Sequence, residues 1–221
     1  MAHGRTEELR IVGGHLALDL VNTVAPRVPG DTGGRDYLPD PAELLAWSRR
    51  IDIVNPAEAE AVEAVWQGAP DLAEQALRAT VEIREATYLV MAQRASGVGA
   101  MPAEFEQGQG STFERLMLRW AAASARSMLV PSESGPGVAE LRVGTAPALM
   151  IPDRLVAAAV ELLRTIELRQ LRACPVDDSG CGFLFLDRSR NGSRRWCSME
   201  DCGTRAKIRK LSARRRAAST V

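Results

Sequence analysis

All four cysteines of this 221-residue chain lie close together near its C-terminus, at Cys174, Cys181, Cys197 and Cys202. They form a C-x6-C pair and a C-x4-C pair, with fifteen residues between the pairs. Four thiolates make one complete tetrahedral shell for Zn²⁺, and structural zinc sites commonly present their ligands as two pairs. The cysteines therefore predict a structural site for one Zn²⁺.

Other uses of the same four cysteines have to be weighed against zinc. Disulfides are disfavoured because residues 1–8 are polar and charged, unlike an export signal, so we expect a cytoplasmic protein in a reducing compartment. No apolar run approaches the roughly 18 residues that a membrane span needs. The C-x6-C pair is wider than the usual two to four intervening residues. An iron–sulfur cluster or a redox dithiol therefore stays open as an alternative.

The residues between the two cysteine pairs predict a β-hairpin. Phe183-Leu184-Phe185-Leu186 has the length and apolar character of a strand, and Asn191-Gly192 readily adopts the positive φ values of a tight reversal. The chain would return through residues 193–196 to Cys197. Such a hairpin would carry the second cysteine pair back to the first.

A basic helix is expected after Cys202, over residues 203–211, with Thr204, Ile208 and Leu211 on one face. The whole chain has 28 basic and 28 acidic residues, but residues 165–221 hold 13 basic and 6 acidic ones. That segment therefore has a net charge of +7, and residues 1–164 have a net charge of −7. A basic module on an acidic body is expected to bind a polyanion such as duplex DNA.

The candidate DNA contacts lie on the predicted hairpin and helix. They are Arg190, Arg194, Arg195, Arg205, Lys207, Arg209, Lys210 and Arg214. Arg205, at the start of the helix, is the best candidate for a base edge because a guanidinium can donate to O6 and N7 of guanine together. Two other interpretations remain: a basic segment that is solvated or folds onto its own acidic domain, and a zinc-stabilised module that binds an acidic protein instead of DNA.

The preceding residues predict a mainly helical domain with one small β-hairpin. Residues 126–130 and 139–143 would form this hairpin across a turn rich in proline, glycine and serine. Apolar spacing and N-caps followed by proline, at Asp40-Pro41 and Asn55-Pro56, predict the helices. These are expected at 16–24, 41–51, 56–66, 71 to the Gly97-Val98-Gly99 stretch, 111–123 and 152–171. The last would join the body rigidly to Cys174. We expect a helical domain at 1–168, a finger at 169–216 and a tail at 217–221.

No catalytic constellation is found, and the chain is not expected to be an enzyme. It has two histidines, His3 and His15, and neither a nucleophile elbow nor a phosphate-binding glycine loop. Asp19, Asn22 and Arg84 interrupt apolar helix faces, so they are candidates for binding a small polar effector. The alternative is a buried hydrogen-bond network that fixes helix packing.

The segment from Cys174 to Lys207 closely resembles the CGNR zinc finger, a module of bacterial transcription regulators. In those proteins the finger follows a helical ABATE domain. The stretch Gly13-Gly14-His15-Leu16-Ala17-Leu18-Asp19-Leu20-Val21-Asn22-Thr23 resembles the start of that domain, and Leu44-Leu45-Ala46-Trp47 and Ile83-Arg84-Glu85-Ala86 also match. The resemblance implies a stress-induced transcription regulator. One residue departs from it: the signature Cys-Gly-Asn-Arg is Cys202-Gly203-Thr204-Arg205 here, which affects contacts of the missing amide but not the metal ligands.

Overall fold

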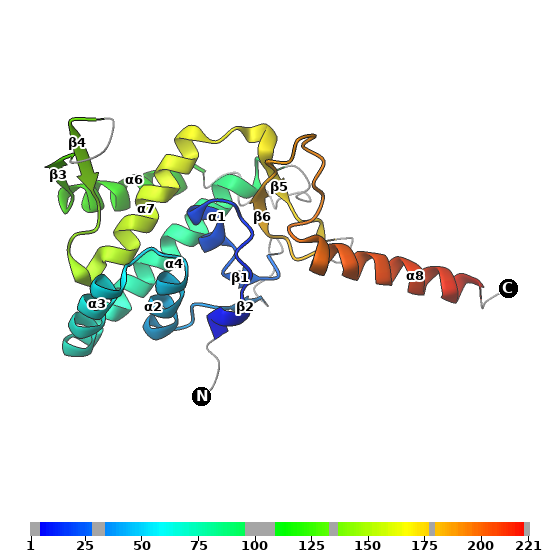
Figure 1. Ribbon diagram of the computed structural model, residues 1–221, viewed down its shortest axis with the longest axis horizontal. Helices are drawn as coiled ribbons and strands as arrows, with labels where there is room; N and C mark the ends of the chain where they lie inside the picture. The colour runs from blue at the N-terminus through cyan, green and yellow to red at the C-terminus, as the bar shows by residue number, and fades with distance from the viewer. Residues whose placement is uncertain (1–4, 28–33, 96–108, 133–136, 177–179, 219–221) are drawn as a thin grey trace.

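The computed structural model describes residues 5–27, 34–95, 109–132, 137–176 and 180–218 (Figure 1). Its helices are η1 (Arg5–Glu8), α1 (Leu16–Val21), α2 (Pro41–Arg50), α3 (Pro56–Gly68), α4 (Pro70–Ala92), α6 (Gln109–Ala125), η2 (Pro147–Leu149), α7 (Met150–Thr165), η3 (Leu168–Gln170), η5 (Met199–Gly203) and α8 (Thr204–Ala218). Its strands are β1 (Val24–Ala25), β2 (Arg35–Asp36), β3 (Met128–Pro131), β4 (Ala139–Arg142), β5 (Leu171–Ala173) and β6 (Leu184–Leu186). The predicted end of α4 at Gly97-Val98-Gly99, His3 and residues 219–221 of the predicted tail lie outside the described residues.

The expected fold class is confirmed: a mainly helical body carries a small hairpin and a C-terminal finger. The long helix α4 packs against α1, α2, α3, α6 and α7. The predicted caps explain where α2 and α3 begin, because the Asp40 side chain accepts from the Glu43 N–H and Asn55 forms a capping box with Glu58. No helix among the described residues is both long and apolar enough to cross a membrane.

The body hairpin forms as predicted, with β3 antiparallel to β4 and Leu129 opposite Leu141. The end of the body differs from the prediction. Helix α7 stops at Thr165, and Ile166 takes an extended conformation. Apolar spacing suggested a helix as far as Leu171, but the Leu171 side chain is fully buried as part of strand β5. The joint between body and finger is therefore a short 3-10 turn and a strand, not a continuous helix.

The strand pairing in the finger also corrects the prediction. Strand β6 pairs with β5, with Leu171 opposite Leu186 and Ala173 opposite Leu184, and residues 193–196 form no strand. The return of the chain is fixed instead by the Asp187 carboxylate, which accepts hydrogen bonds from the backbone N–H of Ser189 (3.0 Å) and of Arg194 (2.8 Å). Side-chain capping of a loop thus replaces the ladder of a second hairpin strand.

The body and the first half of the finger share one hydrophobic core. Leu184 and Phe185 of β6 are fully buried and belong to the same cluster as Leu18 of α1 and Leu155 of α7. Helix α8 differs, because Figure 1 shows it projecting away from the body at the end of the molecule opposite β3 and β4. Its described apolar side chains Ile208 and Leu211 are exposed.

Candidate metal centre and its attachment to the helical body

The four cysteine side chains meet at one point. Their Sγ atoms all lie within 4.8 Å of one another, with Cys181 3.3 Å from Cys197 and Cys197 3.7 Å from Cys202. A tetrahedral Zn²⁺ with bonds of about 2.3 Å would have sulfur–sulfur edges of about 3.8 Å. The four donors therefore fit a tetrahedral metal ion of this size. Cys174, Cys197 and Cys202 are buried, and Cys181 is half-buried beside a cavity of about 690 Å³.

The first ligand pair is held by the backbone next to β5 and β6. The Cys174 N–H donates to the Phe183 carbonyl (2.9 Å), and the Gly182 N–H donates to the Cys174 carbonyl (3.1 Å). Gly182 has a φ of +73°, and a Cβ there would lie 1.7 Å from the Arg27 carbonyl oxygen. Only glycine can combine this conformation with this close approach. The body therefore constrains the backbone immediately after Cys181.

The second ligand pair lies around η5. Ser198 caps this turn by accepting from the Asp201 N–H, and the Gly203 N–H donates to the Ser198 carbonyl (3.1 Å). The Arg10 side chain in the N-terminal segment reaches the same turn, with its Nε 2.6 Å from Asp201. These contacts place Cys202 two residues before Thr204, the first residue of α8. Metal binding and the direction of α8 are thereby linked.

Two arginines predicted to contact DNA are engaged inside the finger. Arg205 donates to Cys202 Sγ at 2.9 Å, so it supports a metal ligand. Hydrogen bonds from the Cys174, Cys181 and Cys197 thiols, and then from Arg205, lower the pKa of Cys202, which favours the thiolate that a metal requires. Arg194 donates to the Trp196 and Cys197 carbonyls, and its guanidinium lies 4.6 Å from the centre of the Phe185 ring. Both residues therefore have contacts that the sequence did not suggest.

Arg205 is nevertheless exposed, and so are the six remaining residues that were predicted to contact DNA. These six are Arg190, Arg195, Lys207, Arg209, Lys210 and Arg214. Arg195, Lys207, Arg209 and Lys210 also line a groove of about 340 Å³ beside Trp196 at the start of α8. Together they make one side of the finger cationic around an indole ring. Thr204, where the CGNR signature has asparagine, is exposed, and its hydroxyl donates to the Met199 carbonyl in the preceding turn (3.1 Å).

Two of the three candidate effector residues attach the finger to the body. Asn22 is fully buried, its Nδ2 donates to the Leu184 carbonyl (2.8 Å), and its Oδ1 accepts from the Leu184 N–H (3.0 Å). Asp19 Oδ1 accepts from the Gly13 N–H (2.8 Å), and the Gly13 carbonyl accepts from the Leu186 N–H (2.9 Å). Asn22 and Gly13 therefore hydrogen-bond to Leu184 and Leu186, two alternate residues on the edge of β6 that faces away from β5. Burial raises the pKa of Asp19 to about 6, although N–H groups of Gly13 and Val12 partly oppose this.

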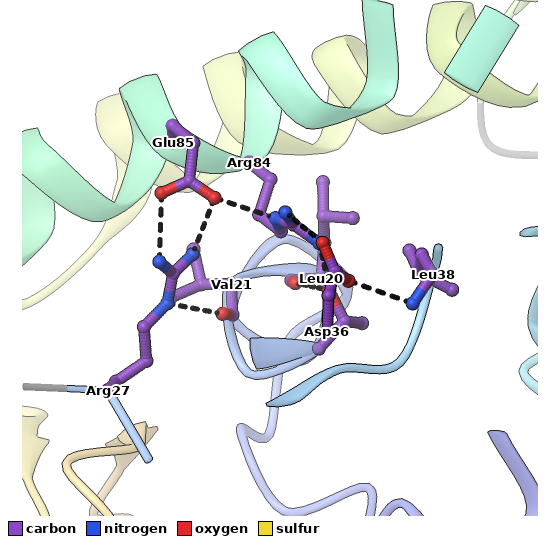
Figure 2. Close-up of polar contacts among 8 residues, drawn as sticks. Leu20, Val21, Arg27, Asp36, Leu38, Arg84 and Glu85 are labelled. Carbon is purple, nitrogen blue, oxygen red and sulfur yellow. Dashed lines mark hydrogen bonds and ion pairs between the residues drawn. The ribbon is translucent and has the colours of Figure 1, made fainter. Parts of the chain in front are cut away.

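The third candidate, Arg84, belongs to a chain of alternating charges (Figure 2). Arg84 pairs with Asp36 through two bonds of 2.8 Å, and Glu85 bridges Arg84 and Arg27. Burial alone would raise the pKa of Asp36, but the hydrogen bonds and positive charge of Arg84 outweigh it and keep that pKa below its usual value. The Arg27 backbone N–H then donates to the Cys181 carbonyl (2.7 Å). Helix α4 is thus connected to a metal ligand through Glu85 and Arg27.

These contacts favour the buried-network interpretation of Asp19, Asn22 and Arg84. Each side chain has protein partners, and the three face different segments. Sequence reasoning missed Arg27, Glu85, Asp187 and Arg10. Asp187 had a local signal, since an aspartate two residues before a serine after a strand is typical of an Asx turn. For Arg27 and Arg10 the sequence holds no local signal, because their partners lie far along the chain.

Comparison with known families agrees with this architecture. Residues 170–215 match the CGNR zinc finger, and residues 14–166 match ABATE, described as "Putative stress-induced transcription regulator". No curated protein matches the chain. The ABATE match spans well over half of the 221 residues, and the finger match contains all four clustered cysteines. The chain therefore belongs to the ABATE family, and it carries a CGNR zinc finger whose four cysteines lie close enough together to hold one metal ion.

Proposed function

We propose that this protein is a zinc-dependent regulator that binds duplex DNA through its finger. The observation that carries the proposal is the composition of α8: seven of its fifteen residues are arginine or lysine and none is acidic. A helix with this charge is the kind of element that enters the major groove and contacts phosphates on both sides. Its projection from the body leaves it accessible to a duplex (Figure 1).

Zinc is the metal that the donors favour. Four sulfur ligands in a closed, largely buried shell are typical of structural zinc, and Arg205 stabilises the thiolate form of Cys202. Bound Zn²⁺ would hold the segments around Cys174 and Cys202 together and thereby orient α8. The role assigned to the chain is binding and not catalysis, and it suits a cytoplasmic protein that acts on chromosomal DNA.

The exposed cations around Trp196 support a phosphate-binding surface. Arg195, Lys207, Arg209 and Lys210 line the groove beside Trp196, and two further predicted contacts, Arg190 and Arg214, are exposed elsewhere on the finger. If five or six of them neutralise phosphates, log affinity plotted against log salt concentration should have a slope of about −5, since each contact contributes about −0.9. Most of these contacts would position the finger and would not read the sequence.

A protein-binding role is the second candidate. Ile208 and Leu211 are 58% and 55% exposed on the same helix, which would suit an acidic partner with an apolar strip. The two functions are separated by titrating zinc-loaded protein against labelled duplex DNA at several salt concentrations, with Lys207→Ala, Lys210→Ala and, as a control on the body, Arg78→Ala. DNA binding predicts that each finger variant weakens affinity and reduces the slope by about one, while Arg78→Ala changes neither. Absence of binding at low salt would reject the DNA proposal in favour of a protein partner.

A further inference from the structure

The hairpin of β3 and β4 exposes several large apolar side chains. Leu129 and Leu141 lie opposite each other and are 72% and 53% exposed, and Val138 beside them is 95% exposed. An isolated two-stranded sheet is at best marginally stable in water, and exposed apolar clusters mark interaction sites. Figure 1 shows this hairpin at the end of the molecule opposite α8.

The outer edge of β4 is open to another strand. The Ser132 N–H donates to the Val138 carbonyl, so the peptide groups of Val138 point toward β3. Because this direction alternates along a strand, the peptide groups of Glu140 and Arg142 also point toward β3. Residues 139 and 141 therefore direct theirs away from β3. Within the described chain these outward groups have no hydrogen-bond partner. A cavity of about 600 Å³ separates this part of β4 from Ala57 and Ala61 of α3.

The sequence of β4 is complementary to itself when it is read in the opposite direction. In Ala139-Glu140-Leu141-Arg142-Val143, an antiparallel copy centred on Leu141 would place Glu140 opposite Arg142, Leu141 opposite Leu141, and Ala139 opposite Val143. Glu140 and Arg142 are both exposed, and within one chain they are 4.0 Å apart. The outward peptide groups of Leu141 are those that a two-fold axis at this residue would pair.

We propose that two copies of this chain dimerise by pairing their β4 strands antiparallel about Leu141. The two hairpins then form one four-stranded sheet. Leu129 and Leu141 of both copies lie on the same face of that sheet, because residues opposite each other in an antiparallel pair share a face. Two ion pairs between Glu140 and Arg142 fix the register. The dimer leaves both α8 helices accessible and does not depend on what α8 binds.

Charge reversal tests this register directly. Glu140→Arg gives a strand with two arginines, and Arg142→Glu gives a strand with two glutamates, so each variant would place like charges opposite each other twice in its own dimer. We expect each single variant to raise the dimer dissociation constant about tenfold or more. Mixing the two variants restores complementary pairs, as does the double variant E140R/R142E. Analytical ultracentrifugation over a concentration series measures all four samples and the wild type.

Dimerisation of the wild type, its loss in both single variants and its return in the mixture would establish the pairing. A wild-type protein that stays monomeric at all concentrations, or single variants that dimerise as strongly as the wild type, would overturn it. Recovery in the double variant but not in the mixture would also overturn it, because the contact between residues 140 and 142 would then be internal to one chain. The melting temperature of each variant monitors folding, and Glu60→Arg, an exposed charge reversal on α3, serves as the control.

Discussion

Asn22 and Leu184 lie 162 positions apart in the chain and hydrogen-bond to each other in both directions, at 2.8 and 3.0 Å. The carboxamide of Asn22 thus acts as a peptide group that continues the sheet beyond β6. Leu184 lies between the two cysteine pairs in the sequence. Its contact with Asn22 therefore fixes the part of the finger that joins the two pairs to the end of α1.

Replacing Asn22 by alanine is expected to destabilise the protein strongly. The change leaves the buried N–H and C=O of Leu184 without partners, at a cost of about 2–4 kcal/mol in the free energy of unfolding. Urea denaturation measures this cost. The matched control is Asn55→Ala, which removes an exposed helix cap and should cost only about 1 kcal/mol. If the two variants lose the same free energy of unfolding, the buried pair of hydrogen bonds between Asn22 and Leu184 contributes no more to stability than an exposed helix cap.

Loss of the metal is expected to unfold the finger unevenly. Zinc binding contributes on the order of 10 kcal/mol to folding of such modules. In Cys202→Ser, residues 187–216 should lose protection from hydrogen exchange, because α8 projects from the body and its described apolar side chains Ile208 and Leu211 are exposed. Strands β5 and β6 should stay protected, since they belong to the body core. Equal loss of protection in β6 and α8 would contradict this expectation.

Arg205 is expected to act on the metal more than on DNA sequence. Because its guanidinium donates to Cys202 Sγ, Arg205→Ala should weaken zinc affinity by roughly ten- to a hundredfold. Lys210→Ala, on the exposed side of the same helix, should leave zinc affinity unchanged. Competition with a chromogenic chelator measures both variants. If the two bind zinc equally well, the Arg205 contact has no influence on the metal.

The pH dependence of stability should contain a contribution from Asp19 with a defined sign. Because burial raises its pKa from 3.8 to about 6, the folded protein binds this proton more tightly than the unfolded chain. Stability from this group is present below about pH 4 and is lost as pH rises to about 6, by up to about 3 kcal/mol. Asp19→Asn keeps an oxygen for the Gly13 N–H and should remove this loss.

His15 lies nearby and changes the stability with pH in the opposite direction. The contribution of Asp19 is therefore measured as a difference between the wild type and the Asp19→Asn variant, not from the pH curve of the wild type alone. Burial lowers the pKa of His15 below 6.5, and its protonation therefore removes stability as pH falls. Subtracting the unfolding free energy of the wild type from that of Asp19→Asn between pH 4 and 7 cancels this contribution. A flat difference over that range would show that Asp19 titrates normally in the folded state.

Features that depend on neighbouring residues were predictable from sequence. The caps at Asp40 and Asn55, the helices that they begin, the body hairpin and the clustering of four cysteines all follow from local spacing. Pairing in the finger was not predictable. The strand Leu184–Leu186 was recognised, but its partner is β5, where apolar spacing compatible with a helix concealed a strand.

The sequence by itself determined that this chain has a helical body, four cysteines spaced as two pairs and a strongly basic last helix, because residue type and short-range periodicity suffice for each. Only the tertiary structure decided that Asn22 and Asp19 attach the finger, that Arg27 contacts the backbone of Cys181, and that Arg205 turns back to Cys202. The physical reason is that a buried polar side chain forms hydrogen bonds with whichever polar group tertiary packing places next to it. That partner can lie far along the chain, where no local pattern identifies it.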